Sequence, residues 1–218
     1  MRFIAFVSFL VITKMLFAQK TVTKEIIFKG TSISIKLENI DQLELKHANN
    51  NKIIVTSSEQ TDEVSFFTIE ANSKEAVIKN TKAKVKKLSN ACIEAPLLSS
   101  YSISIPEKLT VNIFIHNGNF KTNFFSGVLN IELDTGEIEL NRFNGTIKIK
   151  HIDGNIFSNF NQGELIIHNH LGKTKCNLKS KTLQKNKQNI NGFLQNRINH
   201  LEMETIRGNI YIKSVETL

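Results

Sequence analysis

Three histidines fall in neighbouring segments of the chain and could together hold a metal ion. His168 and His170 are two residues apart, so both would face one side of a strand, and His151 precedes them by about one turn of the repeat described below. The acids that could complete such a site, Glu132 or Asp153, have no distinctive spacing, and the chain has no Cys-x-x-Cys or His-Glu-x-x-His motif. We therefore predict solvated turn histidines, no metal site and no cofactor.

Four charged residues could instead act on a polysaccharide, since parallel β-helices include lyases and hydrolases that carry acids or bases on one outer face. These residues are Glu132, Glu137, Glu139 and Lys150. Catalysis needs a paired acid and base in a groove. Glu132 and Lys150 are separated by one full turn of the repeat described below, which is typical of an ordinary ion pair between adjacent strands. We predict no catalytic residues and no enzyme activity.

The elements that must position these side chains are set by a glycine repeat. Apolar residues lie mainly two and four places after each glycine, with polar residues between them, which is the alternation of a half-buried strand. The glycines are nine residues apart, with one more in phase after a gap: Gly118, Gly127, Gly136, Gly145, Gly154, Gly163, Gly172 and then Gly208. The repeat therefore predicts that each nine-residue unit forms one strand and one turn, with glycine at the corner. The predicted fold is all-β, a parallel β-helix or β-solenoid.

A second period, twice as long as the first, indicates how many strands form one turn of the solenoid. Asn123, Asn141, Asn159 and Asn177 recur at every second unit, and isoleucine alternates with mostly smaller residues at the neighbouring core position. We expect two units, and so two strands, per turn, one in each of two facing sheets, and an asparagine ladder along one edge. A three-sided helix with three units per turn is the alternative.

Calcium is a further ligand that nonapeptide repeats bind when they carry the G-G-x-G-x-D pattern. The turns here have one glycine each, and Asp134 and Asp153 occupy different places in the frame. The sequence does not predict calcium-dependent folding.

The chain divides into a leader and one domain. Arg2, the apolar run of residues 3–12 and Ala18 are typical of a secretory signal peptide over residues 1–18; an uncleaved anchor is the alternative. The single β-solenoid domain, residues 19–218, consists of four predicted segments. They are irregular rungs and a cap (19–105), regular repeats (106–178), an exposed loop (179–192) and closing rungs (193–218).

The net charge of +8 could attract a polyanion, and for an exported protein an anionic polysaccharide or lipid of the envelope is a more suitable partner than nucleic acid. Most lysines are scattered, however, which favours an ordinary solvated surface. Two lysine clusters, residues 79–87 and 179–187, are predicted to be exposed. Cys92 and Cys176 are the only cysteines; a disulfide and a buried free thiol both remain open. The alternation turns Phe114, Phe157 and Ile166 outward, either as a partner surface or beneath the N-terminal region.

The run Ser104–Leu109, the following Val111 and Ile113, and the repeated Gly-x-Ile-x-Ile/Leu units resemble the auto-transporter adhesin families of bacterial envelopes, with head-GIN or toastrack-like domains. Residues 201–212 look like the last rung of that family, and the leader ending Phe17-Ala18-Gln19 is similar to those of Bacteroidetes. The resemblance implies an exported β-solenoid without established catalytic residues, so no site is carried over.

We therefore expect an exported, non-enzymatic binding or scaffold module, an adhesin, at the bacterial cell envelope. An envelope-stress or signalling accessory domain acting through protein contacts is the alternative, and a polysaccharide-active enzyme is the third interpretation. The expected partner is an envelope protein or glycan, with no nucleic acid and no transmembrane segment after signal removal. The expected location is the periplasm, the outer surface or the medium; ligand, oligomeric state and final location stay open.

Overall fold

The structure, a computed structural model, describes residues 20–59, 67–80, 98–195 and 198–214. The predicted signal peptide, Cys92 and most of the lysine cluster at residues 79–87 lie outside these ranges. The strands in the described residues are β1 (Lys20–Ile27), β2 (Ser32–His47), β3 (Lys52–Glu59), β4 (Phe67–Ala71), β5 (Glu75–Asn80), β6 (Ser100–Ile105), β7 (Leu109–Thr122), β8 (Phe125–Thr135), β9 (Ile138–Leu140), β10 (Phe143–Asp153), β11 (Ile156–Asn159), β12 (Gly163–Asn169), β13 (Thr174–Cys176), β14 (Gln184–Lys185), β15 (Asn189–Leu194), β16 (His200–Arg207) and β17 (Ile210–Lys213). None of the described segments forms a helix long and apolar enough to cross a membrane.

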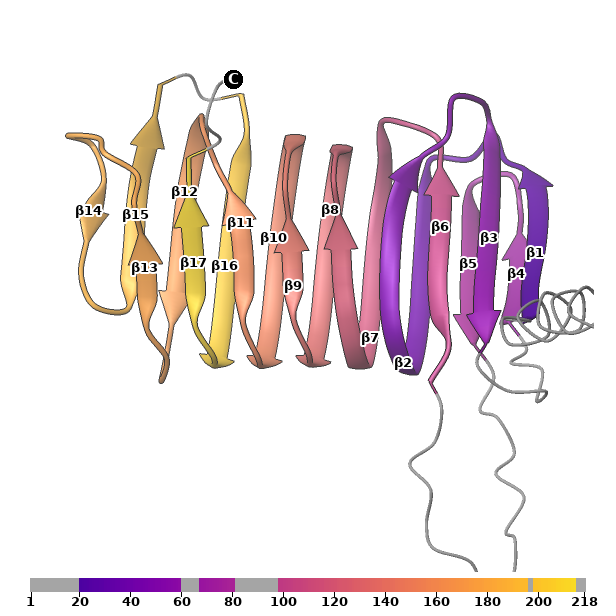
Figure 1. The fold of residues 1–218 in the computed structure, drawn as a ribbon. Helices are drawn as coiled ribbons and strands as arrows, with labels where there is room; N and C mark the ends of the chain where they lie inside the picture. The colour runs from indigo at the N-terminus through magenta and orange to yellow at the C-terminus, as the bar shows by residue number, and fades with distance from the viewer. Residues whose placement is uncertain (1–19, 60–66, 81–97, 196–197, 215–218) are drawn as a thin grey trace, which may run out of the picture.

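Two layers of parallel strands run through the centre of the molecule. The first part of β7 pairs with β8, which pairs with β10, whereas the last residues of β7 pair with β9, which pairs with β11. Figure 1 shows the strands side by side along one long axis. Antiparallel pairs occur near the two ends, where β1 and β3 pair at one end and β12 and β15 at the other. The fold is therefore all-β with a large, mostly parallel sheet, consistent with the predicted β-solenoid.

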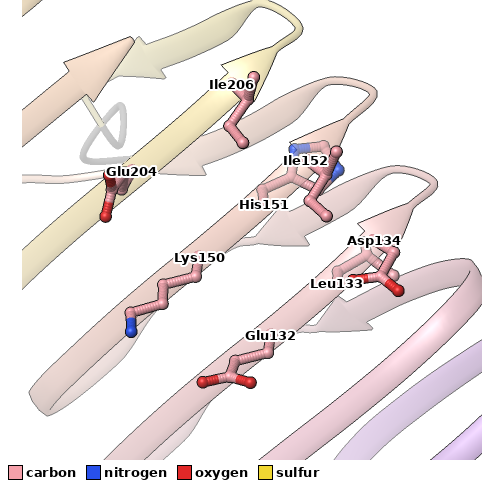
Figure 2. A pocket seen from close by; sticks show the side chains of 8 residues that line it. All are labelled: Glu132, Leu133, Asp134, Lys150, His151, Ile152, Glu204 and Ile206. Atoms are coloured by element: carbon pink, nitrogen blue, oxygen red, sulfur yellow. The ribbon is translucent and has the colours of Figure 1, made fainter. Parts of the chain in front are cut away.

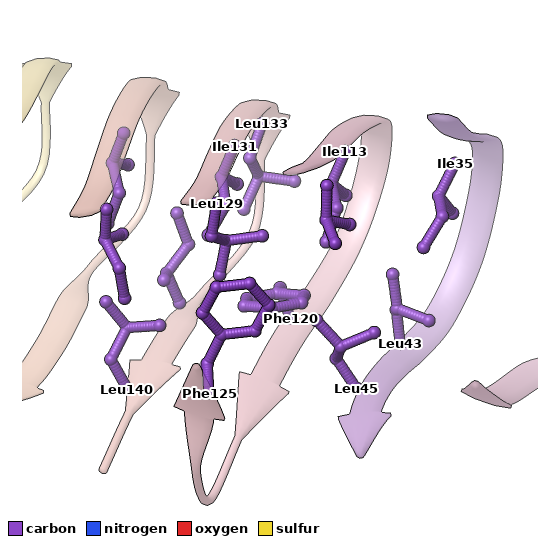
Figure 3. Close-up of a cluster of buried hydrophobic side chains, with 14 of the residues drawn as sticks. Ile35, Leu43, Leu45, Ile113, Phe120, Phe125, Leu129, Ile131, Leu133 and Leu140 are labelled. Carbon is purple, nitrogen blue, oxygen red and sulfur yellow. The ribbon is translucent and has the colours of Figure 1, made fainter. Parts of the chain in front are cut away.

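The hydrophobic core lies between the two layers. Leu129 and Ile131 of β8 point toward Phe120 of β7 and Leu140 of β9 (Figure 3), and each of these four side chains is at most 1 % exposed. The register places Ile131 beside Ile149, which follows it by two glycine units. The alternation of buried and outward side chains thus has the same register in neighbouring strands, and the buried apolar residues form continuous columns.

The corner glycines pack backbone against backbone. Gly136 has φ of +141°, and a Cβ atom there would lie 2.0 Å from the carbonyl oxygen of Gly118. Gly154 meets Gly136 in the same way, and Gly208 meets Gly154. Only glycine permits this approach, because any side chain would overlap the neighbouring carbonyl. The prediction that glycine forms the corners is confirmed.

Three members of the predicted asparagine ladder are in place. Asn141 donates from Nδ2 to Oδ1 of Asn123 at 2.9 Å, and Asn159 donates to Asn141 at 3.1 Å. The third step is missing, because Asn159 is the register partner of Lys213 rather than of Asn177. The ladder therefore stops at Asn159.

The ladder stops because a C-terminal segment is inserted into the stack. Strand β16 pairs in parallel with β10 on one side and with β12 on the other, and β17 lies likewise between β11 and β13. We call β16 and β17, residues 200–213, the C-terminal rung. Leu201 of this rung is the register partner of both Ile147 and Leu165, which precede it by six and by four nine-residue units. Spatial order here differs from chain order (Figure 1).

The two ends of the stack are closed by irregular additions. Beyond β12, β15 pairs antiparallel and β14 pairs with β15, so residues 179–192, predicted as an exposed loop, contain β14 and part of β15. At the other end β5 and β6 stack in parallel on β2, and β3 and β4 add antiparallel strands. Within residues 193–218, predicted as closing rungs, β16 and β17 lie between other strands of the stack.

Candidate functional site

The candidate site lies on the outer face of the first layer, which we define by the outward side chains of β7, β8, β10, β16 and β12. A row of charged residues crosses it. Lys150 of β10 is the register partner of Glu132 of β8 on one side and of Glu204 of β16 on the other. Figure 2 shows the three side chains on neighbouring strands, projecting to the same side. The predicted adjacency of Glu132 and Lys150 is confirmed, and the third member comes from the C-terminal rung.

An apolar pair lies beside this row. Ile152 of β10 and Ile206 of β16 are next to each other in Figure 2 and are 39 % and 45 % exposed. Together with Glu132, Asp134, Lys150 and Glu204 they line a shallow hollow of about 360 Å³. Leu171, which is 72 % exposed, donates its backbone N–H to the carbonyl of Ile206. Exposed apolar side chains gathered at one place mark a surface able to bind a partner.

Side chains of the C-terminal rung contact side chains of opposite character on both flanking strands. Lys148 of β10 contacts Glu202 at 2.8 Å, and His200 Nδ1 contacts Glu164 of β12 at 3.0 Å. The hydrogen bond from Lys148 holds the pKa of Glu202 below its ordinary value, against the smaller opposing effect of burial. The contact with Lys148 therefore favours an acidic residue at the place of Glu202, beside β10.

The three histidines of the metal hypothesis are not gathered at one site. His168 and His170 are exposed on β12 and just after it, as predicted, and His170 Nε2 lies 3.3 Å from Glu204. His151 was predicted to be solvated, and this prediction is wrong: its side chain is 2 % exposed and points inward. Among the described residues, no group of three His, Cys, Asp or Glu side chains is arranged to hold a metal ion.

His151 is buried because it occupies an inward place in the alternation. The inward column that it joins contains Leu133 in β8 and Thr205 in β16. Its Nε2 lies 3.0 Å from the carbonyl oxygen of Gly136, so Nε2 carries the proton and donates, which leaves Nδ1 to accept from the Thr205 hydroxyl at 3.4 Å. Burial lowers the pKa of His151, although the Gly136 carbonyl and Asp153 oppose the shift. His151 thus ties β10 to a glycine corner and to the C-terminal rung.

The remaining candidate acids bind neighbouring side chains. In the second layer, Glu139 accepts from Asn141 Nδ2 at 3.3 Å, and Glu137 accepts from Asn155 at 3.2 Å. Asp134 contacts His116 at 2.6 Å. These contacts are cross-strand ion pairs and amide hydrogen bonds of ordinary strength.

Phe114 and Phe157 are exposed, as the alternation predicted, but together with Ile166 they do not form one patch. Phe114 on β7 and Ile166 on β12 are separated by β8, β10 and β16, and Phe157 on β11 belongs to the other layer. Phe157 instead stacks on Tyr211 of β17. The actual apolar pair was missed because the contact between Ile152 and Ile206 depends on the insertion of β16. The available signal in the sequence was an apolar residue, Ile206, beside the charged residues Glu204 and Arg207.

The lysines and the cysteine at the end of the stack differ in their surroundings. Lys185 Nζ donates to the carbonyl oxygens of Cys176 and Leu178, so it covers backbone acceptors at the edge of β13. Lys179, Lys181 and Lys187 are exposed, as predicted for this cluster. Cys176 is half-buried, and a bridge from it to Cys92 falls outside the described residues.

Comparisons with known proteins return structures only. No protein-family model matches the sequence, and no curated protein matches it. A crystal structure of a "putative cell adhesion protein" from Clostridium sporogenes is 14 % identical, with a TM-score of 0.67, over 90 % of this chain and 100 % of that one. A "putative adhesin" from Bacteroides fragilis is 12 % identical over 90 % and 98 %, with a TM-score of 0.29. A "putative lipid binding protein" from Parabacteroides distasonis is 9 % identical over 89 % and 97 %, with a TM-score of 0.32. At these identities the likeness to the Clostridium protein is one of fold, along nearly the whole of both chains.

Proposed function

We propose that the protein is an exported, non-enzymatic β-solenoid that acts as a binding or scaffold module, an adhesin, at the bacterial cell envelope. The observation that carries this proposal is the exposed apolar pair Ile152 and Ile206 beside the charged row of Glu132, Lys150 and Glu204. An exposed apolar centre with a polar rim is the usual composition of a protein-binding surface. The partner is an envelope protein or glycan.

The proposal includes the finer fold. The register offset between β8 and β10, and likewise between β9 and β11, equals two nine-residue glycine units, which supports a turn made of two strands. The fold likeness to the Clostridium protein supports a relationship with the head-GIN and toastrack-like adhesins. Export would use the leader at residues 1–18.

A rigid scaffold suits such a role. Each strand of the outer face is hydrogen-bonded along its length to strands on both sides, so the side chains of Lys150, Ile152 and Ile206 keep fixed spacings. A fixed surface loses little conformational entropy when it binds, which favours affinity.

A retention experiment with matched variants tests the proposal. Mature protein (residues 19–218), immobilised and exposed to envelope fractions, is expected to retain a protein or glycan. Ile206→Asp should lower retention at least tenfold, because a charge replaces the apolar centre. Val128→Asp is the control, since Val128 is 39 % exposed on β8 of the same face but does not line the hollow.

Two outcomes would overturn the proposal. The first is that wild-type protein retains nothing, or that both variants retain the same material as wild type. The second is turnover: a glycan panel incubated with the protein should release no reducing ends and no unsaturated products, and their appearance would restore the enzyme hypothesis.

A further inference from the structure

The C-terminal rung occupies a position that the rest of the stack does not require. It separates β10–β11 from β12–β13, yet these two strand pairs are two glycine units apart in the chain, the same offset that separates β8 from β10. Residues 160–162 link Asn159 to Gly163 and reach past the C-terminal rung to the strand beyond it. Direct pairing of β12 with β10 would need no change in chain length.

The side chains of β12 and β13 match those of β10 and β11 at this offset. Direct pairing would place Gly163 on Gly145 and Leu165 on Ile147, so the corner column and the core column would both continue. It would also place Asn177 beside Asn159, which would complete the asparagine ladder that now stops. The sequence therefore encodes two neighbours for β12.

We infer that the stack is a two-state device: the C-terminal rung can withdraw, and β12–β13 then close directly on β10–β11. The inserted state gains the burial of Leu201, Met203, Ile210 and Ile212, each at most 1 % exposed. It also gains the ion pair between Lys148 and Glu202. These contacts explain why insertion is the state observed.

Withdrawal would change the outer face. Glu204 and Ile206 belong to the C-terminal rung, so the hollow of Figure 2 exists only in the inserted state. In the direct state Lys150 would lie beside His168, and Ile152 beside His170. A binding role for the hollow, which rests on the proposed function, would be switched off by withdrawal; the two-state device itself stands without that role.

One substitution should shift the balance. A Cβ atom on Gly208 would lie 1.6 Å from the carbonyl oxygen of Gly154, and Gly208 has φ of +149°, so Gly208→Ala cannot be seated between β11 and β13. In the direct state residue 208 leaves this corner and alanine meets no such overlap. Lys213→Ala, at an exposed position of the same rung, is the matched control.

Disulfide pairs in the full-length chain report the state, in a background where Cys92 and Cys176 are serine. Lys150→Cys with Glu204→Cys joins register partners of the inserted state. Lys150→Cys with His168→Cys joins positions separated by β16, about 9.6 Å apart at two strand spacings, too far for a bridge. Glu132→Cys with Lys150→Cys joins neighbours in both states.

With Gly208, oxidation should form the 150–204 bridge and not the 150–168 bridge. With Gly208→Ala this pattern should reverse, while Lys213→Ala keeps the parental pattern and the 132–150 bridge forms throughout. The inference is overturned if Gly208→Ala keeps the 150–204 bridge. It is equally overturned if Gly208→Ala forms neither variable bridge, whether or not the 132–150 bridge persists, because the stack then does not close without the C-terminal rung.

Discussion

The ring of Phe157 in β11 lies face to face with the ring of Tyr211 in β17, with centroids 5.0 Å apart and planes inclined by 8°. The two residues are register partners although six glycine units separate them in the chain. On the far side of Tyr211, Lys175 Nζ lies 5.4 Å from the ring centroid. This outer column therefore joins three rungs through one aromatic pair and one cation.

The stacked rings should contribute a measurable coupling to stability. Phe157→Ala and Tyr211→Ala together should cost less than the sum of the single changes, with a coupling of about 0.5–1.5 kcal/mol in urea unfolding. Phe114→Ala combined with Tyr211→Ala is the control, because Phe114 is similarly exposed on β7 of the other layer. A coupling near zero for the Phe157 pair would contradict the stacking.

The glycine corner should tolerate no side chain. Gly136→Ala places a methyl group 2.0 Å from the Gly118 carbonyl oxygen at φ +141°, so we expect a loss of about 3 kcal/mol or more in the free energy of unfolding. Thr146→Ala, at a half-buried outward position on β10, should change stability by about 0.5 kcal/mol or less. Chemical denaturation of both variants checks this difference, and equal midpoints would refute it.

The asparagine ladder should depend on amide donors and not on size alone. Asn141→Asp keeps the shape but removes the donor to Asn123 and sets a carboxylate beside Glu139. We expect a loss of about 1 kcal/mol at neutral pH, measured by urea unfolding. The loss should shrink once acid protonates the carboxylates. Asn177→Asp is the control, since Asn177 lies outside the continuous ladder, and it should have little effect.

His151 should make the protein less stable in mild acid. The unfolded chain binds a proton at this imidazole as the pH falls through 6.5, whereas burial lowers the pKa in the folded chain. The free energy of unfolding is therefore highest above pH 6.5 as far as His151 is concerned. It falls progressively below pH 6.5, because the unfolded chain binds the proton more readily than the folded chain. His151→Leu, which repeats the Leu133 of the same column, should flatten the dependence between pH 7 and 5. An unchanged slope in His151→Leu would contradict the assignment.

The periodic features could be predicted because each depends on a short stretch of chain. Alternation places Leu129 and Ile147 in the core, and the nine-residue spacing places Gly136 at a corner. The burial of His151 followed from the same alternation, but its position near the strand end favoured a solvated turn. The prediction failed there because the alternation continues past Ile149 to a third inward place, two residues further along β10.

The spatial neighbours of the C-terminal rung could not be predicted from periodicity. Leu201 follows Ile147 by six glycine units and Leu165 by four, and both offsets are even numbers of units. The position of Leu201 within the nine-residue repeat therefore places it in the same core column as Ile147 and Leu165, wherever the C-terminal rung lies along the stack. Complementary charges, such as Lys148 with Glu202, favour its place, and they are properties of the folded neighbours.

The inserted position of the C-terminal rung also determines how the protein resists mechanical load. A rung at the end of a stack can be peeled away one hydrogen bond at a time along a single seam. A pull on the C-terminus of this chain must instead draw β17 and β16 out from between β11 and β10 on one side and β13 and β12 on the other. Both seams are loaded together, so the C-terminal rung is an anchored point through which tension can pass.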